Sequence, residues 1–221
     1  MLFRDRTEAG QKLALLLRRY NHRKDVVVLG LPRGGVPVAY EIATALGAPL
    51  DVFVLRKLGV PDHEELAFGA IASGGVRVLD DEIIEAFGLS DLDIQTVTES
   101  EQRELERREA LYRGGRPRLD VKDKTVILVD DGIATGSSMR AAITAIRQVK
   151  PTRVVVATPV APVSTYMELK GEVDEVVCAE IPSNFQTVGQ FYVNFSQTTD
   201  DEVIGLLNEI ERPLSSKAVR Y

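Results

Sequence analysis

The chain has 221 residues, of which 44% are hydrophobic and 27% charged, a balance typical of a globular protein rather than a disordered or fibrous one. One cysteine and two histidines exclude an internal disulfide and argue against cysteine-based zinc sites and all-histidine metal centres. The net charge of −6, together with an N-terminus that lacks a signal-peptide pattern and a sequence without a long apolar run, predicts a cytoplasmic protein that binds neither nucleic acid nor membrane.

Short apolar runs rich in β-branched residues recur along the chain, which is typical of buried parallel strands. They span residues 26–29, 50–55, 125–129, 153–158 and 175–179. Helical patterns separate several of these runs, at residues 36–46, 138–149 and 162–170. The alternation of strand and helix predicts an α/β fold with a parallel sheet flanked by helices.

The interval between residues 55 and 125 is too long for a single crossover. It holds apolar runs at 66–72 and 76–79 and helical patterns at 80–87 and 99–112. The last pattern is almost entirely charged, which is typical of a solvated helix, although a moving lid or a partner surface would look the same. We therefore expect a single domain, residues 1–221, in which residues 56–116 form an insertion or flap.

Residues 125–139 read TVILVDDGIATGSSM, so a buried strand runs straight into two adjacent carboxylates. Because ligands of open α/β sheets bind beyond the carboxyl ends of strands, Asp130 and Asp131 are candidate binding residues. The loop that follows opens a helix N-terminus, which favours phosphate, and Thr135 adds a hydroxyl. A phosphorylated sugar fits both halves, whereas ordinary helix capping would explain the hydroxyls but not the acid pair.

Two common nucleotide-binding motifs do not match this segment. No lysine follows Gly136, as a nucleoside-triphosphate P-loop would require. The G-x-G-x-x-G fingerprint of dinucleotide-binding folds is missing from the segment as well.

The segment from Val129 to Ser138 resembles the phosphoribosyl-pyrophosphate signature of the type I phosphoribosyltransferases. The resemblance implies that Asp130 and Asp131 contact the ribose hydroxyls and take part in catalysis. It implies that Mg²⁺ lies near these two acids, mainly through substrate oxygens and water. It further implies a homodimer, and that a loop wraps the 5-phosphate, formed by Ala134, Thr135, Gly136, Ser137 and Ser138.

Two further strand ends support the resemblance. GLPRGGVP at residues 30–37 falls where the family has its pyrophosphate loop, which often carries a non-proline cis peptide. Arg33 can neutralise a diphosphate, while Gly34 and Gly35 relieve the backbone. The Arg56-Lys57 pair resembles the basic pair of adenine and orotate phosphoribosyltransferases, which implies that both bind substrate and that Lys57 is catalytic. Taken alone, a plain loop and solvated basic residues would explain these stretches.

The wider pattern, including Asp5-Arg6, Ala9-Gly10 and ELAFGA at residues 65–70, resembles a group of bacterial predicted phosphoribosyltransferases. In 6-oxopurine enzymes of the type I family an aspartate follows the acid pair by three residues. Ala134 occupies that position here, so the loop is closer to the adenine type. A base could come instead from His63, Glu64 or Glu65, although solvated loop residues fit that trio equally well.

Aromatic residues gather in a segment expected to form a small hood, residues 180–200. Phe185, Phe191 and Tyr192 are candidates for an acceptor pocket because clustered rings can stack on a flat heterocycle. Together with Phe195, they could equally cover a sheet edge or form a dimer contact. Cys178 is predicted to be a buried small hydrophobe, and His22 a surface loop residue.

These features predict an enzyme of nucleotide metabolism that transfers ribose 5-phosphate from phosphoribosyl pyrophosphate to a nitrogen of a nucleobase-like acceptor, with Mg²⁺. The main alternative is a non-catalytic phosphoribosyl-pyrophosphate-binding regulatory protein, which would not need the full set of Arg33, Lys57 and the acid pair. A phosphoribosyl-pyrophosphate synthase relative would need a longer chain and an ATP site. A phosphoacceptor receiver domain would not need the hydroxyl-rich loop.

Overall fold

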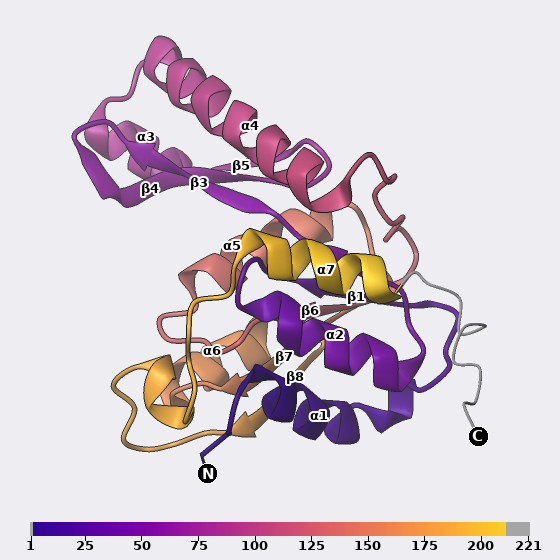
Figure 1. Ribbon diagram of the computed structural model, residues 1–221. Helices are drawn as coiled ribbons and strands as arrows, with labels where there is room; N and C mark the ends of the chain where they lie inside the picture. The colour runs from indigo at the N-terminus through magenta and orange to yellow at the C-terminus, as the bar shows by residue number, and fades with distance from the viewer. Residues whose placement is uncertain (1, 211–221) are drawn as a thin grey trace, which may run out of the picture.

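The structure is a computed structural model that describes residues 2–210, apart from the side chains of Glu64 and Glu65. Its centre is a five-stranded parallel sheet in the order β2-β1-β6-β7-β8 (Figure 1). The strands are β1 (Val26–Gly30), β2 (Leu50–Val52), β6 (Thr125–Val129), β7 (Arg153–Val160) and β8 (Glu175–Glu180). All residues of β1 and β6 are buried, as their unbroken apolar sequences predict.

Helices cover both faces of this sheet, which confirms the predicted α/β fold. One face packs against α1 (Arg6–Leu16), α2 (Gly35–Leu46) and α7 (Asp200–Ile210), and the other against α5 (Ser137–Gln148) and α6 (Val163–Glu172). Short 3-10 helices lie at Arg18–Tyr20 (η1) and Val188–Phe191 (η2). Successive side chains of a strand point to opposite faces, so Val28 lies in the core that contains Ile42 of α2, and Leu29 in the core that contains Met139 of α5.

The apolar run at 50–55 does not form a single strand. Strand β2 ends at Val52, and Leu55 begins β3 (Leu55–Val60). With β4 (His63–Ala72) and β5 (Val76–Leu79), β3 forms a separate antiparallel sheet in the order β3-β4-β5. Helices α3 (Asp81–Phe87) and α4 (Asp91–Arg113) follow, and the whole unit projects from one side of the core (Figure 1).

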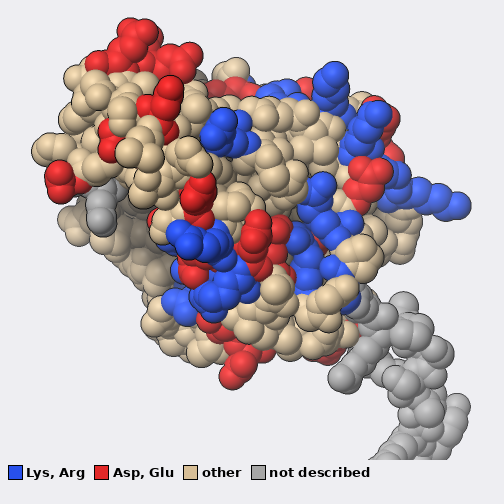
Figure 2. Space-filling model, turned by 90° about the horizontal axis from the view of Figure 1, so that it is seen from above, with Lys and Arg blue, Asp and Glu red and all other residues tan. Residues whose placement is uncertain are grey.

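Helix α4 is longer and less solvated than its charged sequence predicts. It begins at Asp91 because Ser90 and Asp93 form a capping box. Leu105 and Tyr112 are each only 1% exposed, and they pack in the same core as β3 and α2. Its outer face is charged, and acidic side chains gather at the end of the unit that carries α3 and the start of α4 (Figure 2).

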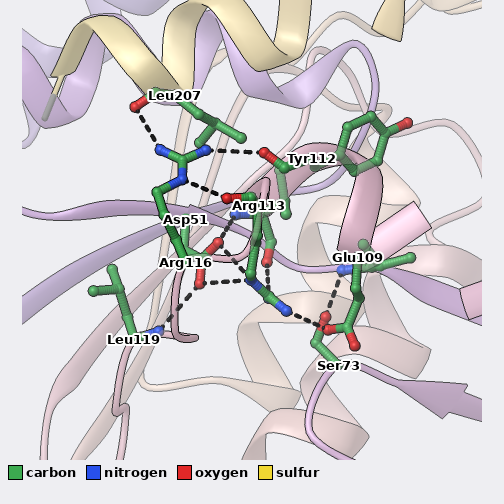
Figure 3. Close-up of polar contacts among 10 residues, drawn as sticks. Asp51, Ser73, Glu109, Tyr112, Arg113, Arg116, Leu119 and Leu207 are labelled. Carbon is green, nitrogen blue, oxygen red and sulfur yellow. Dashed lines mark hydrogen bonds and ion pairs between the residues drawn. The ribbon is translucent and has the colours of Figure 1, made fainter. Parts of the chain in front are cut away.

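A buried ionic network ties the end of α4 to the core sheet (Figure 3). The Arg113 Nε donates to Asp51 on β2 at 3.1 Å, Nη1 donates to Glu109 at 2.6 Å, and Nη2 donates to the carbonyl of Val52 at 3.2 Å. Asp51 also accepts from the Leu119 N–H at 3.2 Å. Every charge of this network therefore has a partner, which buried charges require.

Removing one partner of this network should destabilise the chain strongly. Replacing Arg113 by methionine leaves the Asp51 carboxylate buried without its counter-ion, so we expect the free energy of unfolding to fall by about 3 kcal/mol. Urea denaturation followed by circular dichroism measures this change. The exposed Arg107 of the same helix, paired with Glu104, is the control, and Arg107→Met should change the stability far less. Equal effects of the two changes would contradict the assignment.

The structure also bears on three smaller predictions. His22 is an exposed residue with a positive φ of 56°. Cys178, predicted to be buried, is only half-buried. Its Sγ–H donates to the carbonyl of Glu180, and burial raises the pKa of its thiol to about 12. Within residues 2–210, no helix has the length and apolarity needed to cross a bilayer.

Candidate functional site

The candidate site lies where the carboxyl ends of β1 and β6 meet. After β1 the chain leads through α2 to β2, and after β6 it leads through α5 to β7 on the other side of the sheet. Such a reversal of strand order is where open α/β sheets bind ligands. The sequence therefore brings three elements together here: the acid pair (Asp130 and Asp131), the arginine loop (residues 31–35) and the hydroxyl loop (residues 134–138).

The arginine loop packs directly against the acid pair. The Leu31 N–H donates to the carbonyl of Val129 at 2.9 Å. A Cβ atom on Gly34 would overlap the Asp131 carboxylate, and one on Gly35 would overlap the carbonyl of Val129. Only glycine permits this approach. The peptide between Pro32 and Arg33 is cis, as the resemblance implies.

The two carboxylates of the acid pair lie in different environments. Desolvation and the adjacent Asp131 charge raise the pKa of Asp130 well above its usual value. Its Oδ1 accepts a hydrogen bond from the Asp131 N–H at 2.9 Å. Asp131 is ion-paired instead, because the Arg6 Nε donates to its Oδ2 at 2.7 Å. The site therefore places one carboxylate that resists ionisation beside one that a cation neutralises.

This arrangement should cost the ligand-free chain stability. Because the pKa of Asp130 is higher in the folded than in the unfolded chain, its contribution to stability is present at low pH and is lost as the pH rises through the folded value. We therefore expect Asp130→Asn to raise the melting temperature by about 3 °C at pH 8 and by less at pH 4. Scanning calorimetry at the two pH values measures the difference. A larger gain in melting temperature at pH 4 than at pH 8 would contradict a raised pKa of Asp130 in the folded chain.

The hydroxyl loop is held from neighbouring helices. The Thr165 hydroxyl of α6 donates to the carbonyl of Ala134 at 2.7 Å, and the Arg140 guanidinium of α5 donates to the carbonyl of Thr135. Gly136 has a positive φ of 77°, a conformation that favours glycine. Helix α5 then begins at Ser137 without a side-chain cap, and Thr135, Ser137 and Ser138 are exposed.

Lys57 reaches this loop from the inserted sheet. Its ammonium group donates to the Ser137 hydroxyl at 2.8 Å. Arg56 does not join it, because successive side chains of a strand point to opposite faces. Arg56 is ion-paired with Glu101 on α4, on the face where Leu58 packs in the core. Lys57 therefore lies at the loop and Arg56 at α4, and substrate binding by the two residues stays a prediction.

Arg33 lies beside an acidic residue that sequence reasoning missed. Its Nη1 is 3.9 Å from Oδ1 of Asp200, in the first turn of α7. The same oxygen accepts from the Tyr112 hydroxyl of α4 at 2.7 Å, and burial followed by this bond raises the pKa of Tyr112 to about 12. A single carboxylate thus connects Arg33 with α4 and α7.

The hood side of the site is built from the aromatic segment and the N-terminus. Phe3 and Tyr192 form a β-bridge, and their rings lie 5.5 Å apart. Tyr192 is only 6% exposed and its hydroxyl donates to the carbonyl of Asp131 at 2.7 Å. The ring of Tyr192 is therefore enclosed and its hydroxyl supports the acid pair, while its predicted part in an acceptor pocket stays a prediction. Phe185 and Phe191 stack on each other at 5.7 Å and are half-buried.

Of the three candidate bases, the structure describes the side chain of His63 alone. His63 is exposed at the start of β4, where its ring lies 5.7 Å from that of Phe87. The side chains of Glu64 and Glu65 lie outside the described part of the chain. No general base is therefore assigned to these three residues.

The donor set fits Mg²⁺ only as an ion shared with a substrate. Within residues 2–210, apart from the side chains at 64 and 65, no group of three or more His, Cys, Asp or Glu side chains could hold a metal ion. The two acids of the site include one that resists ionisation and one paired with Arg6. Mg²⁺ keeps several waters and often binds through one or two carboxylates and substrate phosphates. Asp130 and Asp131 fit that second arrangement.

Arg6 and Asp200 are the site residues that sequence reasoning did not assign. Asp5-Arg6 stands out in the sequence pattern, but nothing local connects it to a strand end more than a hundred residues away. Asp200 is one of several acidic residues at the start of a helix, where helix capping explains it equally well.

Comparison with known proteins agrees with this arrangement. The family model of the phosphoribosyl transferase domain matches residues 6–196. Two curated proteins from Mycobacterium tuberculosis strains CDC 1551 / Oshkosh and H37Rv, each named "Putative phosphoribosyl transferase", are 47% identical over 211 residues, which is 96% of this chain. The chain spans about half of their length (47%).

A solved structure has the same fold. The crystal structure of TT1426 from Thermus thermophilus superimposes with a TM-score of 0.84 at 42% identity, over 95% of this chain and 99% of that one. The family model covers most of the chain, including the arginine loop, the acid pair and the hydroxyl loop. The chain belongs to the phosphoribosyl transferase family.

Proposed function

We propose that this chain transfers the ribose 5-phosphate group of phosphoribosyl pyrophosphate to a nitrogen of a nucleobase-like acceptor and releases pyrophosphate, with Mg²⁺. The observation that carries the proposal is the convergence of three loops at one sheet edge. There an acid pair lies between two helices, α2 and α5, whose N-termini have no side-chain cap. Helix N-termini attract phosphate, and carboxylates accept hydrogen bonds from sugar hydroxyls.

Each part of the substrate has a counterpart in this arrangement. The 5-phosphate fits the hydroxyl loop, formed by Ala134, Thr135, Gly136, Ser137 and Ser138. The ribose 2- and 3-hydroxyls fit Asp130 and Asp131. The diphosphate fits the arginine loop, where Gly34 and Gly35 let the backbone approach and Arg33 supplies charge. Lys57 bonds to Ser137 in the ligand-free chain, from where its flexible stem can carry the ammonium group to an anion.

The reaction breaks the bond between the anomeric carbon and a pyrophosphate oxygen, and forms a bond from that carbon to an acceptor nitrogen. Where that nitrogen carries a proton, the N–H bond breaks and the proton passes to solvent. Because the transition state has oxocarbenium character, negative charge develops on the leaving pyrophosphate. Arg33 and Lys57 would stabilise that charge. When bound, Mg²⁺ would neutralise diphosphate charge further. The inserted unit of β3, β4, β5, α3 and α4 would exclude water if it closes over the site.

The family resemblance also supports a homodimer that acts on a small-molecule acceptor, and we further propose that it acts in the cytoplasm, as the sequence pattern predicts. Light scattering of the purified chain tests the homodimer. The proposal concerns these 221 residues, since the curated relatives are about twice as long.

Pyrophosphate release tests the function. The chain is incubated with phosphoribosyl pyrophosphate, Mg²⁺ and one member at a time of a panel of purines, pyrimidines and pyridines. We expect release that depends on one acceptor class and on Mg²⁺. Binding of phosphoribosyl pyrophosphate without release from any acceptor would favour the alternative, a non-catalytic regulatory protein.

A further inference from the structure

The N-terminal segment Asp5-Arg6, with Ala9-Gly10, is built to hold one side chain at the acid pair. The Asp5 carboxylate accepts from the Glu8 N–H at 2.9 Å and caps α1, so that Arg6 is its first residue. At Gly10 a Cβ atom would lie only 2.7 Å from the Glu41 Cβ and 2.8 Å from the carbonyl of Val38. Glycine therefore lets α1 pack closely on α2, which fixes where Arg6 begins.

The Arg6 guanidinium is held on three sides. Its Nε donates to Asp131 Oδ2 at 2.7 Å, and its Nη1 donates to the carbonyl of Ser196 at 2.7 Å. The Phe195 ring lies against it, 4.2 Å from Cζ to the ring centroid, and the side chain is only 12% exposed. Such contacts fix the plane of a guanidinium.

One end of this guanidinium is unused. Within residues 2–210, Arg6 Nη2 has no hydrogen-bond partner. In an arginine side chain Nη2 lies on the same side as the Nε–H, and here Nε faces Asp131. A mostly buried donor beside the acid pair is therefore available to a ligand.

Arg6 lies on the acceptor side of the proposed substrate. The elements that hold Arg6 are the N-terminus and the hood, whereas α5, α6 and β3 hold the hydroxyl loop. In ribose 5-phosphate, the two ring carbons that carry hydroxyls lie between the anomeric carbon and the ring carbon to which the phosphate-bearing CH2 group is attached. With the phosphate at the hydroxyl loop and the hydroxyls at the acid pair, the anomeric carbon is directed away from that loop, toward Arg6 and the hood.

We propose that Arg6 determines acceptor specificity, by donating from Nη2 to an oxygen that the acceptor carries near its reacting nitrogen. The acceptor class is thus a heterocycle with a carboxylate or a ring carbonyl oxygen. A carboxamide, whose oxygen is uncharged and which adds an N–H donor, or an amino group in that place should bind less well. This inference rests on the proposed function. A guanidinium that is fixed and largely desolvated discriminates strongly for oxygen acceptors and against additional donors.

Binding, rather than turnover, tests the inference. The chain is saturated with ribose 5-phosphate and titrated in a calorimeter with two matched pairs: a pyridine carboxylate and its carboxamide, and a 6-oxopurine and a 6-aminopurine. We expect the carboxylate to bind at least tenfold more tightly than the carboxamide, or the 6-oxopurine at least tenfold more tightly than the 6-aminopurine, and the pair concerned shows whether the oxygen belongs to a carboxylate or a ring carbonyl. Arg6→Met should abolish the preference, and Arg6→Lys should retain part of it. Arg4→Met, at a neighbouring side chain that is 72% exposed, should change nothing.

Titration with phosphoribosyl pyrophosphate and Mg²⁺ separates the possible failures. Because Asp131 loses its ion-pair partner, we expect Arg6→Met to weaken this affinity as well, but several-fold less than it weakens binding of the preferred acceptor. If Arg6→Met weakens the binding of phosphoribosyl pyrophosphate as much as the binding of the acceptor, Arg6 only positions Asp131 or binds diphosphate, and the inference is overturned. Binding of phosphoribosyl pyrophosphate by a wild-type chain that prefers neither member of either pair overturns the inference alone. A wild-type chain that does not bind phosphoribosyl pyrophosphate overturns the proposed function and the inference together. Should Arg6→Met not fold, Arg6→Lys tests the same point, because it should reduce the acceptor preference while changing the affinity for phosphoribosyl pyrophosphate less.

Discussion

Replacing Lys57 by methionine should lower kcat by about 10²–10³, which is typical for the loss of one group that stabilises developing negative charge. The Kd for phosphoribosyl pyrophosphate should rise less than tenfold, because the arginine loop and the hydroxyl loop still hold both phosphate ends. The effect should fall mainly on kcat because Lys57 is not part of either loop. It lies on a strand of the inserted unit and donates to Ser137 from there. Steady-state pyrophosphate release together with calorimetric binding measures the two quantities separately.

Arg56→Met is the matched control for this change. The two residues are neighbours on β3, carry the same charge and are replaced by the same side chain. Arg56 points to the opposite face and pairs with Glu101, so kcat should change less than threefold. A larger loss of kcat in Arg56→Met than in Lys57→Met would contradict the assignment of Lys57.

The double variant Asp130→Asn/Asp131→Asn should weaken phosphoribosyl pyrophosphate binding by about 10³. In the complex, Mg²⁺ and the ribose hydroxyls favour the ionised form of both acids. Each carboxylate is therefore proposed to accept a charge-assisted hydrogen bond from a ribose hydroxyl, and such bonds contribute about 1.5–3 kcal/mol each. Asparagine keeps the shape of the side chain but removes the charge that these bonds and Mg²⁺ depend on. Isothermal titration with phosphoribosyl pyrophosphate and Mg²⁺ measures the loss.

Asp123→Asn is the control for the acid pair. Asp123 lies just before β6, at the end of that strand opposite to the acid pair, and has a positive φ of 56° that asparagine tolerates. The Asp123→Asn change also removes a carboxylate, so this variant tests for a general effect of net charge. Its affinity for phosphoribosyl pyrophosphate should match that of the wild type. Unchanged affinity in the double variant would instead remove the acid pair from the binding site.

The core of the fold and the central motif could be predicted because both are local in sequence. Strands β1 and β6 are buried on both faces, and such strands consist of unbroken apolar runs. The acid pair follows β6 directly, so recognising the strand also located the two carboxylates at the sheet edge. The arginine loop follows β1 in the same way.

What the sequence did not predict depends on contacts between distant segments. Because the apolar run at 50–55 is continuous, it gave no sign that β3 begins at Leu55. Without that strand, the opposite directions of Arg56 and Lys57 could not be predicted. The burial of Tyr112 depends on α7 and β3 packing against α4. Arg6 and Asp131 are 125 positions apart, and Tyr192 reaches the site through a bridge with Phe3. No local pattern encodes these pairings.

Calorimetric titration of the wild-type chain with phosphoribosyl pyrophosphate, with and without Mg²⁺, tests the central claim most directly. We expect saturable binding of one molecule per chain, which Mg²⁺ strengthens and with which ribose 5-phosphate competes. The acid pair, the two loops and Lys57 would then act on one ligand. Failure to bind phosphoribosyl pyrophosphate at millimolar concentration with Mg²⁺ present would contradict the account, because the three loops would not form the site assigned to them.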